Sequence, residues 1–146
     1  MASTQQLETL IDLAQRETDD AAKRLGAALK AVADAEEKLN MLIGYRDEYG
    51  RRFDASQQQG ITPMAYRNFQ AFMEKLDIAI QGQQEVVRHS KARGDKEKQL
   101  WQDAERKRMS YSTLRDRAEA QELRKEAKRD QKAMDEHASR QAFFKR

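Results

Sequence analysis

A seven-residue repeat of apolar side chains runs without a break through the first third of the chain. When positions a and d of the heptad are counted from residue 4, twelve of the fifteen positions are apolar and four of them are alanine. Such a stripe, which we call the seam, is typical of a coiled coil, and its alanines allow a second helix to approach closely. The fifteen positions are Thr4, Leu7, Ile11, Ala14, Thr18, Ala21, Leu25, Ala28, Val32, Ala35, Leu39, Leu42, Arg46, Tyr49 and Phe53. The repeat predicts a helix over about 4–54.

The repeat lapses after Asp54, and a second helix is predicted to begin after a turn at about 55–61. Thr62 suits the N-cap and Pro63 the first helical position, where the missing N–H of proline needs no partner. The chain contains no other proline. We therefore predict a second helix over about 62–138, followed by a frayed tail at 139–146.

The second helix carries a seam of its own, which is polar from Gln83 to Glu97 and apolar on either side. A short loop between two amphipathic helices favours antiparallel packing. The sequence thus predicts an all-α fold, a single domain over 1–146 that forms a two-helix antiparallel coiled-coil hairpin. A turn centred near Gln58 would place Tyr45 beside Phe72. The first helix would then end opposite Thr113, and the longer second helix would overhang at the C-terminus.

Composition agrees with long helices rather than with a layered core. Charged residues make up 36% of the 146 residues, hydrophobic residues 38%, and the mean hydropathy is −1.03. Compact globular chains carry about 25% charged and about 45–50% apolar residues. There is no cysteine, no signal-peptide pattern at the N-terminus, and no apolar run near the roughly 20 residues that span a bilayer. We expect a cytoplasmic protein that meets a membrane only through its partners.

No pattern of residues indicates catalysis. The six glycines do not form a phosphate-binding loop, and His89 and His137 have no partners at the spacing of a metal site. Adjacent carboxylates such as Asp19 and Asp20 point apart on a helix. A two-helix hairpin also lacks the enclosed pocket that enzymes generally need. We expect no enzyme, no cofactor and no metal.

Apolar residues near the turn exceed what one seam needs. Met41 and Tyr45 lie to one side of the first seam, and Phe72 and Ala79 lie to one side of the second, about 80–100° away from it. We call these four residues the turn-proximal strip. Contiguous exposed apolar residues usually bind a protein partner. The alternative is a broad, well-packed core at the end of the hairpin.

Several segments, in this order and spacing, resemble the FliJ family of bacterial flagellar export proteins. The segments are Leu7-Glu8-Thr9-Leu10, Asp12-Leu13-Ala14, Asp19-Asp20-Ala21-Ala22, Leu25-Gly26, Met41-Leu42-Ile43 with Tyr45 and Glu48-Tyr49, and Asp130-Gln131-Lys132 with Met134-Asp135-Glu136. The resemblance runs from end to end and includes the chain length and the position of the turn.

The resemblance implies a part of the flagellar type III export apparatus, at the cytoplasmic side of the membrane at the flagellar base. It implies a stalk-like protein that enters the ring of the flagellar export ATPase, contacts the membrane export gate and helps to cycle export chaperones. The gate-binding surface of the family maps onto Leu42, Tyr45, Tyr49, Phe72, Leu76 and Ala79. Two flanking residues, Lys38 and Gln83, depart from the pattern of the family.

The C-terminal segment is the predicted contact with the ATPase ring. Residues 115–146 hold ten Lys/Arg and seven Asp/Glu, which accounts for the whole net charge of +3. We predict that the ring contacts are Arg124, Arg129, Lys132 and Met134. The alternative function is a nucleic-acid-binding coiled-coil arm, which a pI near 9.2 allows. Acidic residues alternate with the basic ones, whereas nucleic-acid footprints gather positive charge on one face. We therefore expect no nucleic-acid partner.

Overall fold

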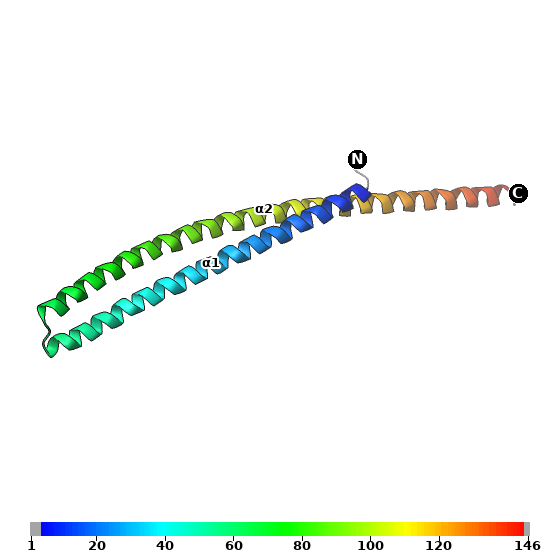
Figure 1. Cartoon of the computed structure of the whole chain (residues 1–146). Coiled ribbons are helices and arrows are strands. Elements are labelled where there is room, and N and C mark those ends of the chain that lie inside the picture. Colours follow the sequence, from blue (N-terminus) through cyan, green and yellow to red (C-terminus); the bar gives the residue numbers. More distant parts are fainter. Residues whose placement is uncertain (1–3, 145–146) are drawn as a thin grey trace. The chain divides into compact units, whose positions relative to one another are not determined.

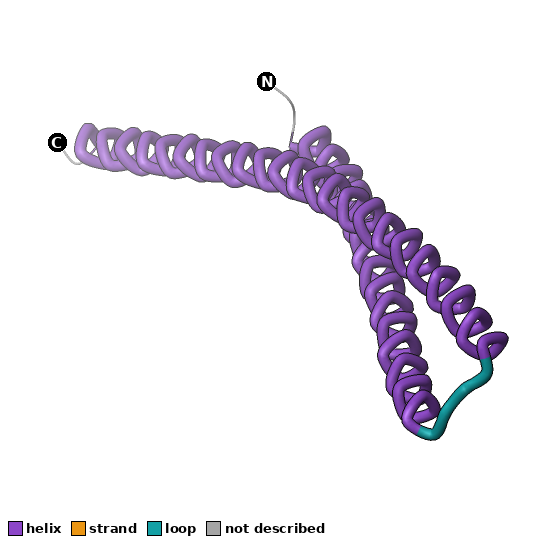
Figure 2. Tube along the Cα trace, turned by 90° about the vertical axis from the view of Figure 1, so that its left-hand side faces the viewer, coloured by secondary structure: helices purple, strands orange, loops and turns teal. Residues whose placement is uncertain are grey.

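A computed structural model describes residues 4–144 as two long helices joined by one short loop (Figures 1 and 2). Helix α1 spans Thr4–Gln58 and helix α2 spans Pro63–Phe144. No strand occurs among residues 4–144. The two helices pack against each other and α2 is the longer one. The predicted fold class, a two-helix hairpin with a longer second helix, is confirmed.

Both helices extend beyond the ends predicted for them. α1 continues past residue 54 to Gln58, because the intervening Ala, Ser and Gln residues include no residue that stops a helix. α2 continues past residue 138 to Phe144, so the residues 139–144 that we expected to fray are helical. Lys145 and Arg146 lie outside the described residues. Since the loop is centred about two residues beyond Gln58, the residue of α2 that faces Tyr45 lies about four positions after the expected Phe72, which is about one turn of helix.

The loop is shaped by Gly60 and Thr62. Gly60 has φ of +88°, the left-handed conformation that glycine adopts without a steric penalty, and its N–H donates to the carbonyl of Gln57 at 3.0 Å. The hydroxyl oxygen of Thr62 accepts a hydrogen bond from the N–H of Ala65 at 3.1 Å. Thr62 is therefore the N-cap of α2, with Pro63 as its first helical residue, as the sequence predicted.

The chain divides into two compact units. The turn unit comprises Asp20–Trp101, and the terminal unit comprises Met1–Asp19 together with Gln102–Arg146. Each unit contains a segment of α1 and a segment of α2, and each is described here by itself. That the whole chain forms one domain stays a prediction.

Small residues let the helices of the turn unit pack closely. Its buried residues on α1 are alanines spaced seven apart. On α2, Gly94 is buried, and a Cβ built there would be in ordinary van der Waals contact with Cγ2 of Val32, at 3.8 Å. Gln83 is buried as well, and its side-chain amide donates to the carbonyl of Ala35 at 3.0 Å. This bond satisfies the amide of Gln83, the first residue in the polar part of the second seam. Trp101, which follows this part, is half-buried. The full set of buried residues in this unit is Ala21, Ala28, Ala35, Leu76, Ile80, Gln83, Val87 and Gly94.

In the terminal unit, α1 packs on α2 through Leu7, Ala14 and Thr18, which are buried. The hydroxyl of Thr18 donates to the carbonyl of Ala14 at 2.9 Å, so this polar side chain is satisfied within its own helix. Ion pairs between the helices flank the seam, and they join Lys107 to Glu17 at 3.5 Å and Arg115 to Glu8 at 3.8 Å. α1 therefore still accompanies α2 at Arg115, beyond the predicted limit near Thr113.

The last part of α2 has no segment of α1 beside it within the terminal unit (Figure 1). Ala118 is half-buried, Thr4 lies near Leu123, and every described residue after Ala118 is exposed. We call residues 124–144 the overhang. At 1.5 Å per residue it measures roughly 30 Å, shorter than the sequence suggested because α1 reaches further along α2 than expected. Neither helix has, within residues 4–144, an apolar segment long enough to cross a membrane.

Candidate partner-binding site

Aromatic side chains from both helices stack next to the loop of the turn unit. The ring of Phe53 lies flat on that of Phe69, with centroids 3.6 Å apart and an interplanar angle of 9°. Tyr49 stacks on the same Phe69 at 5.3 Å, and its ring also contacts Phe72 at 4.5 Å. Tyr66 closes the group against Phe53 at 5.8 Å. These five residues, the aromatic cluster, join the two helices where both seams approach the loop.

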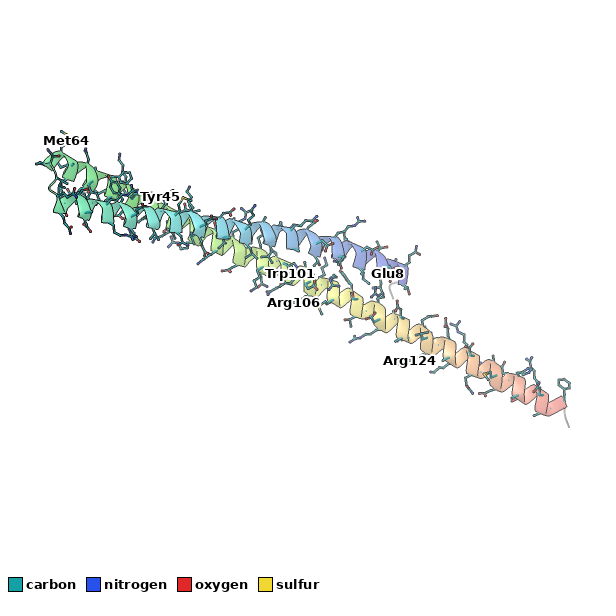
Figure 3. All side chains as sticks on the ribbon, turned by 90° about the horizontal axis from the view of Figure 1, so that it is seen from below. Glu8, Tyr45, Met64, Trp101, Arg106 and Arg124 are labelled. Atoms are coloured by element: carbon teal, nitrogen blue, oxygen red, sulfur yellow. The ribbon has the colours of Figure 1, made fainter. Side chains whose placement is uncertain are left out.

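A shallow hollow lies beside the aromatic cluster on the surface of the turn unit. Its volume is about 200 Å³, and its lining residues are Tyr45, Glu48, Tyr49, Arg52, Phe72 and Leu76. Tyr45 is 54% exposed and Phe72 is 43% exposed, although both are large apolar groups. Figure 3 shows Tyr45 on α1 near the loop end. The turn-proximal strip is therefore an exposed surface rather than only the edge of a core.

The six residues of the predicted gate-binding surface fall into two groups. Leu42, Tyr49 and Leu76 belong to the seam, and they are half-buried or, for Leu76, buried. Tyr45, Phe72 and Ala79 lie beside the seam and are exposed. Four of the six line the hollow, whereas Leu42 and Ala79 do not. The direct ring contact of Phe72 is with Tyr49, because the loop is centred further along the chain than we assumed.

Arg52 makes the hollow polar on the α1 side. Its guanidinium donates to the carboxylate of Glu48 at 2.8 Å, one helical turn earlier, and 76% of the Arg52 side chain remains exposed. Sequence reasoning had assigned no role to this pair. Spacing alone could have identified it, because Glu–Arg pairs four residues apart meet on one helix face. The hollow thus combines an apolar base with a partly neutralised rim.

The predicted ring contacts Arg124, Arg129, Lys132 and Met134 are all exposed on the overhang (Figure 3 labels Arg124). They do not share one face of α2. At roughly 100° per residue, the three basic residues spread over about 140°, and Met134 lies outside that arc. Met134 lies instead on a narrow apolar stripe with Leu123, and both side chains are more than 60% exposed.

Charge is segregated around the start of the overhang, a feature that the sequence reasoning missed. Successive basic residues occupy one side of the helix and successive acidic residues the other, with the stripe of Leu123 and Met134 between them. Helical phase could have revealed this, whereas the linear alternation of charges concealed it. The basic side holds Arg117, Arg124, Lys125, Lys128, Arg129 and Lys132, and the acidic side holds Glu119, Glu122, Glu126 and Asp130.

Side chains that could hold a metal ion do not come together in the part of the chain that the structure describes. No group of three or more His, Asp or Glu residues has the required arrangement there. The Nε2 atom of His137 lies 3.1 Å from the amide nitrogen of Gln141 on the same helix.

Comparison with known proteins identifies a family that covers nearly the whole chain. The model of the family described as flagellar FliJ protein matches residues 3–146. The flagellar FliJ protein of Salmonella typhi is 37% identical over 145 residues, and that of Escherichia coli K12 is 34% identical over the same length. Each alignment covers 99% of this chain and 99% of the relative. The chain is thus a flagellar protein rather than an enzyme, and it belongs to the flagellar FliJ protein family.

Proposed function

We propose that this protein is a cytoplasmic component of the flagellar protein export apparatus, located at the membrane at the flagellar base. It acts there as a stalk and chaperone that links the ring of the export ATPase to the membrane export gate and to the chaperones of export substrates. Family membership over the whole chain supports a flagellar role. The links to the ATPase, the gate and the chaperones rest on the resemblance described above and on two exposed surfaces.

The observation that carries the gate contact is the exposure of two aromatic rings beside the loop. Tyr45 and Phe72 leave about half of their surface in water, although burial of such a ring is worth several kcal/mol. Interface energy concentrates in a few aromatic anchors, and Tyr is among the residues enriched there. The rings are therefore suited to binding the export gate, with the hollow between them receiving an apolar side chain.

A pair of matched substitutions tests the gate contact. Tyr45→Ala removes an exposed ring that makes no ring contact, and it should change the melting temperature little while it reduces binding of the cytoplasmic domain of the gate protein about tenfold or more. Phe69→Ala removes a ring stacked between Phe53 and Tyr49, and it should destabilise the hairpin by roughly 3 kcal/mol. If Tyr45→Ala melts as early as Phe69→Ala, the strip is core and the gate surface is misplaced.

The overhang is proposed to contact the ATPase ring. Residues 124–146 hold eight Lys/Arg and four Asp/Glu, and every residue in the described part of this segment is exposed. A chain that ends at Leu123 should keep its melting temperature within a few degrees, because the deleted residues contribute nothing to the seam. Its binding to the purified ATPase should fall. Unchanged ATPase binding by the shortened chain would contradict this assignment.

The alternative, a nucleic-acid-binding arm, is favoured only by the basic side of the overhang. Five Lys/Arg of the overhang, together with Arg117 before it, gather on one side of the helix, which is the distribution that contacts phosphates. The acidic side of the same helix opposes it, and the relatives carry flagellar names. A gel-shift assay with duplex DNA at 150 mM salt decides between the two. We expect no shifted band, and a band of submicromolar affinity would revive the alternative.

A further inference from the structure

The two long edges of the turn unit differ in how many ion pairs join the two helices across them. In an antiparallel pair of helices, the e positions of both helices face one edge and the g positions face the other. The e edge is closed by ion pairs between α1 and α2, with Lys91 to Glu36 at 3.3 Å and Arg46 to Asp77 at 3.6 Å. The g edge has only one such pair, from Arg24 to Glu97 at 3.5 Å, far from the loop.

Apolar side chains continue along the g edge beyond the turn-proximal strip. On α2, three successive g positions are Phe72, Ala79 and Val86, which are all exposed. On α1 they include Tyr45 and Ala31, which are exposed as well. We call these five residues the extended strip. From Phe72 to Val86 it follows α2 for about 21 Å, or four turns of helix.

Cations without carboxylate partners flank the extended strip. Lys38 occupies a g position of α1, Arg93 occupies a g position of α2, and Lys75 lies at the outer side of α2. None of these three residues forms an ion pair within residues 4–144. The acidic residues nearest this edge are Glu48, which is paired with Arg52, and Asp34. The g edge is therefore apolar along α2 from Phe72 to Val86, and the unpaired cations Lys38, Lys75 and Arg93 lie on or beside it.

We propose that the extended strip binds an acidic amphipathic helix of a partner protein, which packs against the hairpin as a third helix. An apolar stripe about four turns long would cover the strip, and Glu or Asp on both sides of that stripe would pair with Lys38, Lys75 and Arg93. An apolar edge of this length between two helices suits a helix better than a loop. Charges at such an edge select the partner and its register rather than supply most of the affinity.

This inference deepens the gate-binding proposal and rests on it, because it describes the chemistry of the segment that the same surface recognises. It adds two requirements that the gate surface alone does not contain. The contact must extend to Val86 and Ala31, and the bound segment must be acidic. Anionic lipid offers negative charge as well, but a narrow strip 21 Å long between two helices fits one helix, whereas a membrane surface is broad and flat.

Two synthetic helical peptides test the charge requirement on the full-length protein. Both are about 18 residues long, five turns at 3.6 residues per turn, with the same leucine stripe. One carries glutamates beside the stripe and the other carries lysines. Fluorescence anisotropy should show the acidic peptide binding at least tenfold more tightly, with a preference that weakens as salt is added. Equal affinities for the two peptides would overturn the proposal.

Charge reversal locates the site. Lys38→Glu/Arg93→Glu should weaken the acidic peptide at least tenfold and strengthen the basic one, whereas the control Lys98→Glu, at an exposed e position, should change neither. Val86→Glu should also weaken the acidic peptide. A Lys98→Glu effect as large as that of the double variant would mean nonspecific attraction and would overturn the proposal. The same variants are also sedimented with vesicles of anionic lipid. If the wild type sediments with the vesicles and the double variant does not, the strip binds a membrane and the proposal is wrong.

The gate domain separates this inference from the proposed function. Gate binding that is lost in Tyr45→Ala but unchanged in Lys38→Glu/Arg93→Glu would leave the proposed function standing and refute the acidic helix. If the protein prefers the acidic peptide but does not bind the gate domain, the acidic-helix inference stands and the proposed gate contact is refuted. Loss of gate binding in both variants supports the two proposals together.

Discussion

Gly60 occupies the one backbone position among residues 4–144 that an ordinary side chain would strain. Its φ of +88° places it in the left-handed region at the end of α1, and space around its Cα is open. The constraint on this position is therefore conformational and not steric. Gly26, by contrast, lies within α1 with no heavy atom within 4 Å of a would-be Cβ.

Alanine should consequently have opposite effects at these two glycines. Gly60→Ala should destabilise the protein by about 1 kcal/mol, because a Cβ disfavours positive φ. Gly26→Ala should stabilise it by about 0.5–1 kcal/mol, because alanine is the better helix former and the site is open. Urea unfolding followed by circular dichroism measures both. The same sign for the two variants would show that this account of the loop is wrong.

We predict that Glu105 makes a pH-dependent contribution to the stability of the fold. A hydrogen bond from Arg108 lowers the pKa of Glu105 below its ordinary value of 4.5, and Glu105 in turn raises the pKa of Arg108. The two side chains pair through the Arg108 guanidinium, one helical turn apart. A lowered pKa in the folded state stabilises the fold above the unfolded pKa, and this stability is lost as the pH falls through the folded value.

Glu105→Gln should therefore make the melting temperature depend less steeply on pH at acidic pH. Wild type and variant are compared by thermal melts between pH 6 and pH 3, and the difference between them should shrink as the pH falls. Glu136→Gln, on the overhang, is the matched control because its carboxylate forms no ion pair within the described residues. A variant whose melting temperatures run parallel to those of the wild type would contradict the prediction.

At the scale of a helix, the sequence predicted those features that depend on the spacing of residues along the chain. The heptads identified the buried alanines Ala14, Ala21, Ala28 and Ala35, and Thr62-Pro63 located the start of α2. The end of α1 was placed too early, because a polar Gln-rich segment lacks periodicity and yet stays helical. The stacking of Phe53 on Phe69 was not predicted either, because it depends on the register of the two helices across the loop, which could be predicted only to within about one turn.

The overhang shows the same limit for the candidate sites. Its exposure could be predicted from the sparse apolar residues, but its starting point depended on how far α1 reaches, and that depended on the loop. The choice of Arg124, Arg129, Lys132 and Met134 mixed two sides of the helix, because charge was counted along the chain and not around it. Helical phase is available from the sequence, whereas the position of the loop needed the structure.

The overhang and the seam should differ in amide hydrogen exchange. Isolated helices owe most of their stability to packing, and residues 124–144 have nothing packed against them in the terminal unit. Their amides should exchange close to the rate of an unfolded peptide, whereas amides of Leu76–Val87 should be protected by several orders of magnitude. Mass spectrometry of peptic fragments measures both segments. Equal protection would mean that the overhang is stabilised by contacts that we have not identified.

At the scale of the whole molecule, the fold is built from little apolar material. Half of its described buried apolar residues are alanines, and only four larger aliphatic side chains, Leu7, Leu76, Ile80 and Val87, are buried to less than 10% exposure. Ion pairs between the helices occur in both units, yet exposed pairs contribute only about 0–1 kcal/mol each. Most of the aromatic surface is gathered beside the loop, where it is shared between stability and the proposed partner contact.

Trp101 is the only tryptophan, and its place in the seam makes it an optical reporter that is separate from the strip. It follows Phe72 on α2 by 29 residues, which corresponds to roughly 44 Å along the helix axis. Excited selectively near 295 nm, its emission should shift to the red when the seam opens and should stay unchanged when a ligand without tryptophan occupies the strip. A single fluorescence measurement could thus distinguish a variant that fails to bind its partner from a variant whose two helices have separated.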